Sequence, residues 1–187
     1  QAAAWHRRGS AFRMAINLSV RDLADAALPD FVVALLAEHG LPAAALALEV
    51  TESAIMGEPD AAIAVLRRLA DHGIALAIDD FGVGQSSLAY LRRLPVSELK
   101  IDKAFVLNLA HNAEDQAIVR SVIELGHRIG YRVIAEGVED ATSLDLLASF
   151  GCDEAQGYAI SRPLPSEAFE RFAAAWQVRR AFAAAVL

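Results

Sequence analysis

The fold is decided by the stretch Asp60-Ala-Ala-Ile-Ala-Val-Leu-Arg-Arg-Leu-Ala-Asp-His-Gly73-Ile-Ala-Leu-Ala-Ile-Asp79-Asp80-Phe-Gly82. Its first half carries Ile63, Leu66 and Leu69 at helical spacing, and predicts a helix that Asp60 caps and Gly73 ends. Its second half, Ile74–Asp80, is a short apolar run that predicts a strand. A helix that leads through one glycine into a buried strand is part of a βαβ unit.

The same rhythm of helix, glycine and strand repeats along the chain. We expect helices at Leu28–His39, Ser86–Leu94, Ile118–Gly130 and Asp140–Gly151, and a final amphipathic helix at Ser166–Arg180. In the first of these helices, apolar residues form one stripe that we expect to be buried: Leu28, Phe31, Val32, Leu35 and Leu36. The expected strands are Met14–Ser19, Leu46–Ser53, Ile74–Asp80, Glu98–Asp102, Val133–Glu136 and a short run around Gln156–Ile160. The alternation predicts an α/β fold, a TIM-like (β/α)8 barrel with about six of its eight strands in this chain.

Composition narrows the possible partners. The chain has 187 residues, of which 55% are hydrophobic, so it can bury a core and is not disordered. Its net charge of -7 argues against binding DNA through basic patches. No apolar run reaches the roughly 18–20 residues that span a bilayer. The single cysteine, Cys152, excludes an internal disulfide and fits a reducing compartment, so we expect a cytoplasmic protein.

Polar side chains recur where the expected strands end: Asn17, Glu52, Asp79 with Asp80, Lys100, Glu136 and Gln156. Alternation along Ala75–Asp79 puts Asp79 on the face of Ala75 and Ala77, and Leu76 and Ile78 on the face of the helices. The carboxyl ends of barrel strands hold barrel active sites. Carboxylates that converge there repel one another unless hard cations such as Mg²⁺ or Mn²⁺ bind them. The adjacent pair Asp79-Asp80 suits two metals, with Lys100 placed to orient or deprotonate a water.

Six short motifs in this order resemble those of the EAL family of cyclic di-GMP phosphodiesterases. They are Asn17-Leu18-Ser19, Thr51-Glu52-Ser53, Asp79-Asp80-Phe81-Gly82, Leu99-Lys100-Ile101-Asp102, Ala135-Glu136-Gly137-Val138-Glu139 and Gln156-Gly157-Tyr158. The resemblance runs from the first residues to about Pro165. It implies an (α/β)8 barrel that hydrolyses cyclic di-GMP to linear pGpG in bacterial second-messenger signalling, with two Mg²⁺ or Mn²⁺ ions.

The resemblance also implies residue roles. Asn17, Glu52 and Asp79 are similar to ligands of the first metal, while Asp79, Asp80 and Glu136 are similar to ligands of the second. Lys100 resembles the lysine beside the nucleophilic water, and Gln156 resembles the glutamine that contacts a metal-bound water. Glu139 resembles the glutamate that holds the loop Phe81–Ser87, which the family uses in dimer contacts. A homodimer through the barrel loops is therefore expected.

The chain departs from the family pattern in two ways. Val83 and Gln85 stand where the family usually has Thr and Tyr, so the coupling of that loop to activity is expected to differ. We also expect the first two strands and the Glu-Ala-Leu motif with its metal-binding glutamate to be absent. Residues 1–187 are then part of one such domain and alone are expected to hydrolyse cyclic di-GMP far more slowly than the complete domain.

Two other functions are compatible with parts of this pattern. The first is a catalytically inactive EAL-like module that binds cyclic di-GMP or a protein partner, and turnover by the full-length protein would distinguish it. The second is a barrel enzyme that removes a proton next to a carboxylate, as enolases do. The adjacent Asp79-Asp80 pair favours two metals over that chemistry.

Overall fold

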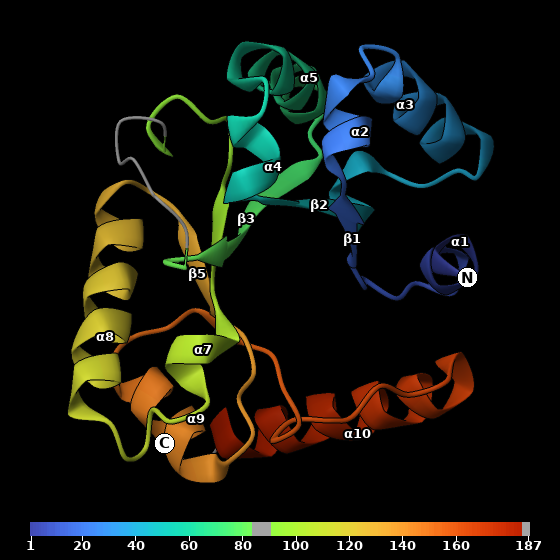
Figure 1. Ribbon diagram of the computed structural model, residues 1–187. Helices are drawn as coiled ribbons and strands as arrows, with labels where there is room; N and C mark the ends of the chain where they lie inside the picture. The colour runs from blue at the N-terminus through green and yellow to red at the C-terminus, as the bar shows by residue number, and fades with distance from the viewer. Residues whose placement is uncertain (84–90, 185–187) are drawn as a thin grey trace.

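The computed structural model describes residues 1–83 and 91–184, and gives residues 177–184 as backbone alone (Figure 1). Gln85 and most of the helix expected at Ser86–Leu94 therefore lie outside the described residues. In the described part of the chain, no helix is both long and apolar enough to cross a membrane.

The centre of the molecule is one sheet of six parallel strands in the order β1-β2-β3-β4-β5-β6. The strands are β1 Met14–Leu18, β2 Leu46–Thr51, β3 Ala75–Phe81, β4 Glu98–Ile101, β5 Arg132–Ala135 and β6 Glu154–Ala155. Each strand pairs with the next along the chain, which is the connectivity of a singly wound barrel. This confirms the barrel-type fold, with six strands described.

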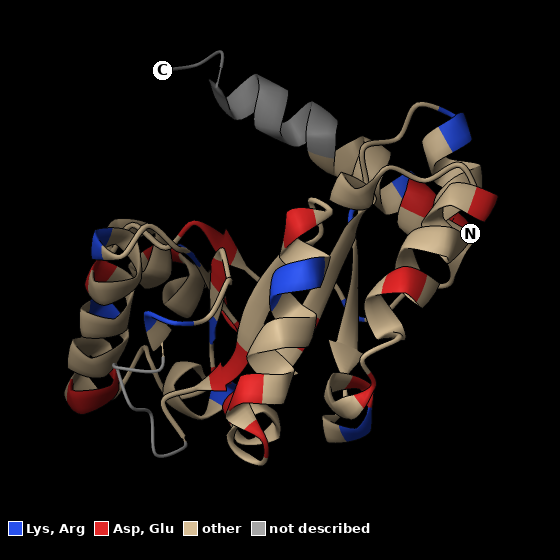
Figure 2. Ribbon diagram, turned by 90° about the horizontal axis from the view of Figure 1, so that it is seen from above, with Lys and Arg blue, Asp and Glu red and all other residues tan. Residues whose placement is uncertain are grey.

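Helices connect the strands and lie outside the sheet (Figure 1). They are α1 Ala2–Arg7, α2 Val20–Ala24, α3 Leu28–Glu38, α4 Glu52–Met56, α5 Pro59–Asp71, α7 Lys103–Val106, α8 Ala113–Arg128, α9 Ala141–Ser149 and α10 Ser166–Ala184, with a 3-10 turn η1 at Ala43–Ala45. Figure 2 shows acidic and basic segments interspersed over these elements.

Three expectations about boundaries and burial need correction. Asp60 does not cap α5, because Pro59 takes the first helical position and Glu58 the cap, so Asp60 lies inside the first turn. The last strand is Glu154–Ala155, earlier than the expected run around Gln156–Ile160.

The third correction concerns the apolar stripe of α3. Leu28, Val32 and Leu36 pack against the core, but Phe31 is 63% exposed and Leu35 42% exposed. The stripe is wider than the surface that α5 offers it, so its far side meets solvent.

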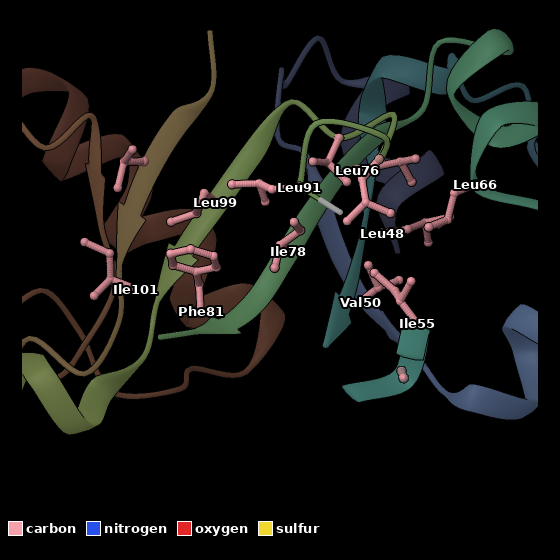
Figure 3. Packing of buried hydrophobic residues seen from close by; sticks show 14 of the residues in the cluster. Leu48, Val50, Ile55, Leu66, Leu76, Ile78, Phe81, Leu91, Leu99 and Ile101 are labelled. Atoms are coloured by element: carbon pink, nitrogen blue, oxygen red, sulfur yellow. The ribbon is translucent and has the colours of Figure 1, made fainter. Parts of the chain in front are cut away.

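The core lies between the sheet and its helices (Figure 3). Leu48 and Val50 of β2, Leu76 and Ile78 of β3, and Leu99 and Ile101 of β4 are all buried and point to this side. They meet buried helix residues that include Ile55, Leu66, Leu69, Val119 and Ile123. Burying one such side chain contributes about 1.5–3 kcal/mol. The positions between them, among them Glu49, Asp79 and Lys100, therefore face the other, concave side of the sheet.

The first helix is in contact with the beginning of the last helix. Trp5 of α1 donates a hydrogen bond from Nε1 to Oε1 of Glu170 in α10 at 2.6 Å. The ring of Phe12 packs edge to face against Trp5 and against Phe169, with the centroids of Phe12 and Phe169 4.9 Å apart. These contacts hold α10 beside the start of β1.

Candidate metal centre at the strand ends

The pairing of β3 with β4 is irregular at the two adjacent carboxylates. Ile78 pairs with Leu99 and Phe81 pairs with Ile101, so β3 has one more residue than β4 between these two pairs. Such a β-bulge re-aims the side chains beside it. Asp80 has a φ of 55°, in the left-handed region that few residues other than glycine adopt. Regular alternation would turn Asp80 away from Asp79, and this local geometry prevents that.

The bulge produces a compact group of carboxylates. Asp79, Asp80 and Glu136 each place a carboxylate oxygen within 4.8 Å of the others. Asp79 comes from β3, and Glu136 follows β5 directly, with its N–H donating to the carbonyl of Ile101 at 3.2 Å. The convergence predicted for these three residues is therefore present in the structure.

Lys100 lies at the centre of this group. Its side chain is 3% exposed, and Nζ lies 2.5 Å from Glu49 Oε2, 2.6 Å from Glu136 Oε1 and 3.1 Å from Asp79 Oδ1. Burial alone would lower the pKa of Lys100, but hydrogen bonds to Glu136 and Glu49 outweigh burial and raise that pKa. The side chain is therefore an ammonium ion in this arrangement, with all three donors directed at carboxylates.

Glu49 is a residue that the sequence analysis missed. It lies in β2, in register with Asn17 of β1 on one side and Ala77 of β3 on the other, so the side chains of Asn17 and Glu49 share the concave face. The available signal was a charged residue inside the apolar run Leu46–Val50, because an unpaired charge is rarely buried there.

Glu52 was predicted as a ligand of the first metal, but it is Glu49 that contacts Lys100. The expected strand Leu46–Ser53 was too long, since β2 ends at Thr51 and Glu52 is the first residue of α4. Thr51 caps that helix by accepting a hydrogen bond from the N–H of Ala54 at 3.3 Å. Within the described residues, neither glutamate belongs to the close carboxylate group, but Glu49 contacts Lys100, which also contacts Asp79 and Glu136 of that group. The geometry thus favours Glu49 over Glu52.

Asp102 is a second missed residue. It is buried, and caps α7 by accepting a hydrogen bond from the N–H of Ala104 at 2.7 Å. Burial, a hydrogen bond from the protonated Asp80 carboxyl to Asp102 and the charge of Asp79 raise the pKa of Asp80. The sequence alone places Asp102 at the end of the expected strand, but it does not show that the Asp102 side chain points toward Asp80.

Burial and neighbouring charges also raise the pKa of Glu136. Burial raises the pKa of Glu136, Lys100 opposes this, and the charges of Asp79 and Glu49 add to the rise. With all groups ionised, the five carboxylates of Glu49, Asp79, Asp80, Asp102 and Glu136 face the single positive charge of Lys100. Carboxylate oxygens are the donors that Mg²⁺ and Mn²⁺ prefer, and two divalent ions would balance this charge. The donor set therefore fits a metal centre.

The other predicted site residues lie around this group. Gln156 follows β6, where its N–H donates to the carbonyl of Ala135 at 2.8 Å and its carbonyl accepts from the N–H of Val138 at 3.0 Å. Glu139 is exposed, and most of the loop Phe81–Ser87 that it was predicted to hold lies outside the described residues. Val83 is exposed as well.

A cleft of about 830 Å³ occupies the concave side of the sheet. Glu49, Lys100 and Gln156 line this cleft, and so do Glu98, Arg132 and Glu154 at the amino ends of β4, β5 and β6. Tyr158 and Arg162 also line it, with the Arg162 guanidinium 4.4 Å from the centre of the Tyr158 ring. The cleft therefore extends from Lys100 toward the amino ends of the strands, and the close carboxylates Asp79, Asp80 and Glu136 lie outside its lining.

Comparison with known families and sequences agrees with this geometry. Residues 1–163 match the model of a family described as EAL domain. A bifunctional diguanylate cyclase/cyclic di-GMP phosphodiesterase of Pseudomonas aeruginosa, MucR, is 44% identical over 168 residues, which cover 89% of this chain and 24% of that protein. The chain thus spans about a quarter of that relative's length.

Solved structures are also similar. The PaMucR phosphodiesterase in complex with c-di-GMP superposes with a TM-score of 0.84 at 43% identity, covering 89% of this chain and 68% of that one. The EAL domain of Mycobacterium smegmatis DcpA gives a TM-score of 0.85 at 36% identity, covering 90% of this chain and 77% of that one.

Proposed function

The chain belongs to the EAL domain family, and we propose that the protein carrying it hydrolyses cyclic di-GMP to linear pGpG with the help of two Mg²⁺ or Mn²⁺ ions. One observation carries the proposal: Lys100 is held among Glu49, Asp79 and Glu136 beside the adjacent carboxylate of Asp80. We further propose that residues 1–187 are part of a single domain of this kind.

Asp79, Asp80 and Glu136 would hold the ions together with Glu49 and Asn17, which share the concave face, and with Asp102 beside Asp80. When bound, such ions neutralise the charge of a phosphodiester and lower the pKa of a bound water. The amide of Gln156, which has no charge, would orient water or substrate from the cleft wall.

Lys100 would supply a positive charge beside the ions. Once the ions bind the carboxylates that Lys100 contacts, its ammonium group would donate a hydrogen bond to the attacking water or to a phosphate oxygen. In the hydrolysis, water adds to one phosphorus, the bond from that phosphorus to a ribose 3′ oxygen breaks, and a proton reaches the departing 3′ oxygen. The product keeps its second phosphodiester and gains a 5′ phosphate.

The acidic composition fits this proposal. A chain with a net charge of -7 repels a substrate with two phosphates unless local cations hold them. Homodimerisation through the barrel loops and a cytoplasmic location, where such a second messenger would be met, remain predictions of the resemblance.

The test is turnover by the intact protein. Purified protein is incubated with cyclic di-GMP and Mn²⁺ or Mg²⁺, and pGpG is measured by chromatography beside the nearly isosteric variant Asp79→Asn. We expect turnover that needs the metal and falls below about a tenth in the variant. If the wild-type protein binds cyclic di-GMP but forms no pGpG with either metal, it is a binding module and the proposal is wrong.

A further inference from the structure

Asp80 is held by its neighbours on both sides. Its φ of 55° is uncommon for a residue with a side chain. The next residue, Phe81, is buried in the core and stands opposite Ile101 of β4. The residue after that, Gly82, has a φ of 104°, so two left-handed residues flank one buried anchor.

Gly82 is in close contact with an aromatic ring. A Cβ atom placed on Gly82 would lie 2.9 Å from Cε2 of Phe105, 3.5 Å from Cζ and 3.7 Å from Cδ2. Real Cβ atoms do not approach carbon so closely, so the ring fits only because residue 82 has no side chain. The backbone of Gly82 cannot move toward α7 while the ring is there.

Phe105 belongs to α7, and this short helix meets the other site loops too. Asp102 at its N-cap interacts with Asp80. Lys103 presses its Cβ against Gly137, where an added Cβ would lie only 2.5 Å away. Gly137 directly follows Glu136. The ring of Phe105 is itself fixed, because it packs against the core.

We propose that Phe105 is a positioning residue of the metal centre: its ring supports Gly82 and thereby keeps Asp80 in the left-handed conformation that turns its carboxylate toward Asp79 and Glu136. The inference rests on the proposed function and deepens it. Phe105 touches neither metal nor substrate; it acts through the backbone of residues 80–82. Without the ring, Asp80 relaxes to an ordinary backbone conformation and the carboxylate group loses one member.

The experiment measures Mn²⁺ binding directly, by calorimetry on the intact protein, together with the unfolding temperature without metal. The variants are Phe105→Ala and the milder Phe105→Leu, which keeps apolar volume but removes the ring. Residues that orient metal ligands typically change metal affinity by about 10–100-fold. We expect Phe105→Ala to weaken Mn²⁺ binding at least about tenfold and Phe105→Leu to weaken it less.

Phe150→Ala is the matched control. Phe150 also packs against the core, but it lies at the end of α9 that leads into β6, near the amino ends of the strands. The Phe150→Ala variant should lower the unfolding temperature by a similar amount and leave Mn²⁺ affinity unchanged. A Gly82→Ala variant should weaken Mn²⁺ binding as well, and its effect should not multiply with that of Phe105→Ala, since both disrupt one contact.

The outcomes separate the two proposals. If the wild type binds Mn²⁺ and Phe105→Ala binds it equally well, Phe105 has only a structural role and the inference is wrong while the proposed function stands. If Phe105→Ala does not fold, Phe105→Leu decides by the same comparison with Phe150→Ala. If the wild type binds no Mn²⁺, both the metal centre and the role of Phe105 are overturned.

Discussion

Lys100 of β4 and Glu49 of β2 form an ion pair of 2.5 Å across the intervening strand β3, although they are 51 residues apart in the chain. Asp79 lies on β3 between them and is the third member of the contact, at 3.1 Å from Nζ. The pair therefore connects three neighbouring strands on the concave face, and it does so where the strand carboxyl ends meet.

The first prediction compares Glu49 with Glu52. Glu49→Gln removes one charge from the contacts of Lys100 with little change in shape, and should weaken Mn²⁺ binding at least about tenfold and reduce turnover with it. Glu52→Gln, on the first turn of α4, should change Mn²⁺ affinity much less. The two variants are compared by calorimetry and by the cyclic di-GMP assay. Equal losses, or a larger loss in Glu52→Gln, would show that Glu52 also belongs to the metal centre and that Glu49 is not favoured over it.

The second prediction concerns Lys100. Lys100→Ala should lower kcat by roughly 10²–10⁴-fold while the affinity for cyclic di-GMP changes little. Loss of affinity with kcat preserved would instead make Lys100 a phosphate anchor.

The same substitution should also affect stability without metal. It leaves Glu49, Asp79 and Glu136 without their cation, and removing one partner of a buried ion pair costs about 3–5 kcal/mol. Denaturant unfolding with and without Mn²⁺ measures this, and Mn²⁺ should recover part of the loss. An unchanged free energy of unfolding in metal-free buffer would show that the carboxylates do not need Lys100.

The third prediction is a pH dependence of the stabilisation by metal. The pKa values of Asp80 and Glu136 are raised above their ordinary 3.8 and 4.5, so the folded protein holds protons there that the unfolded chain has already lost. These bound protons therefore stabilise the folded protein at low pH. The stabilisation decreases as the pH rises from the ordinary pKa values of the two groups through their raised pKa values in the folded protein. Bound Mn²⁺ replaces the protons, so the rise in unfolding temperature that Mn²⁺ causes should grow with pH over this window.

Melting curves with and without Mn²⁺ at about pH 5 and about pH 7.5 test the sign. The double variant Asp80→Asn with Glu136→Gln is the control for the melting curves without Mn²⁺, because it has no proton to exchange at either position and its unfolding temperature should fall less as pH rises. An Mn²⁺-dependent rise that is the same at both pH values in the wild type would contradict the prediction.

The fourth prediction concerns the contact between two site loops. A Cβ atom on Gly157 would lie 2.2 Å from the carbonyl oxygen of Val138 and 2.4 Å from its nitrogen, both of them backbone atoms. Val138 is hydrogen-bonded there to Gln156 and Ala159. Gly157→Ala should destabilise the fold by about 1–3 kcal/mol, as overpacking does, and should lower turnover by displacing the adjacent Gln156.

Gly57→Ala is the matched control, because nothing lies within 4 Å of a Cβ at Gly57 and its φ is -65°. This change should be neutral or stabilise the fold by up to about 1 kcal/mol. Chemical denaturation of both variants gives the comparison. Equal effects of the two substitutions would show that the approach of Gly157 to Val138 is not tight in solution.

Much of the fold could be predicted because its signals are local. The spacing of Ile63, Leu66 and Leu69 is set within one helix, and the alternation in Ala75–Asp79 within one strand, so both could be recognised without knowing what lies beside them. The same alternation put Asp79 and Lys100 on the concave face, and both are there.

Other features depend on contacts between distant segments. Phe31 belongs to a regular apolar stripe, yet it is exposed because no described segment packs on that side of α3. The expected strand Leu46–Ser53 includes Glu52, whereas Thr51 accepts the hydrogen bond that starts α4, so the strand ends at Thr51, two residues earlier.

The sequence by itself determined the alternation of helices and strands, the inward direction of Asp79 and Lys100, and the acidic character of the strand ends, since each follows from the spacing of residues within one segment. Only the tertiary structure decided that Glu49 meets Lys100 and that Asp80 turns toward Asp79. The first depends on the register of β2, β3 and β4. The second depends on a bulge between β3 and β4 and on a ring from α7, and no local pattern encodes a contact whose partner lies on another segment.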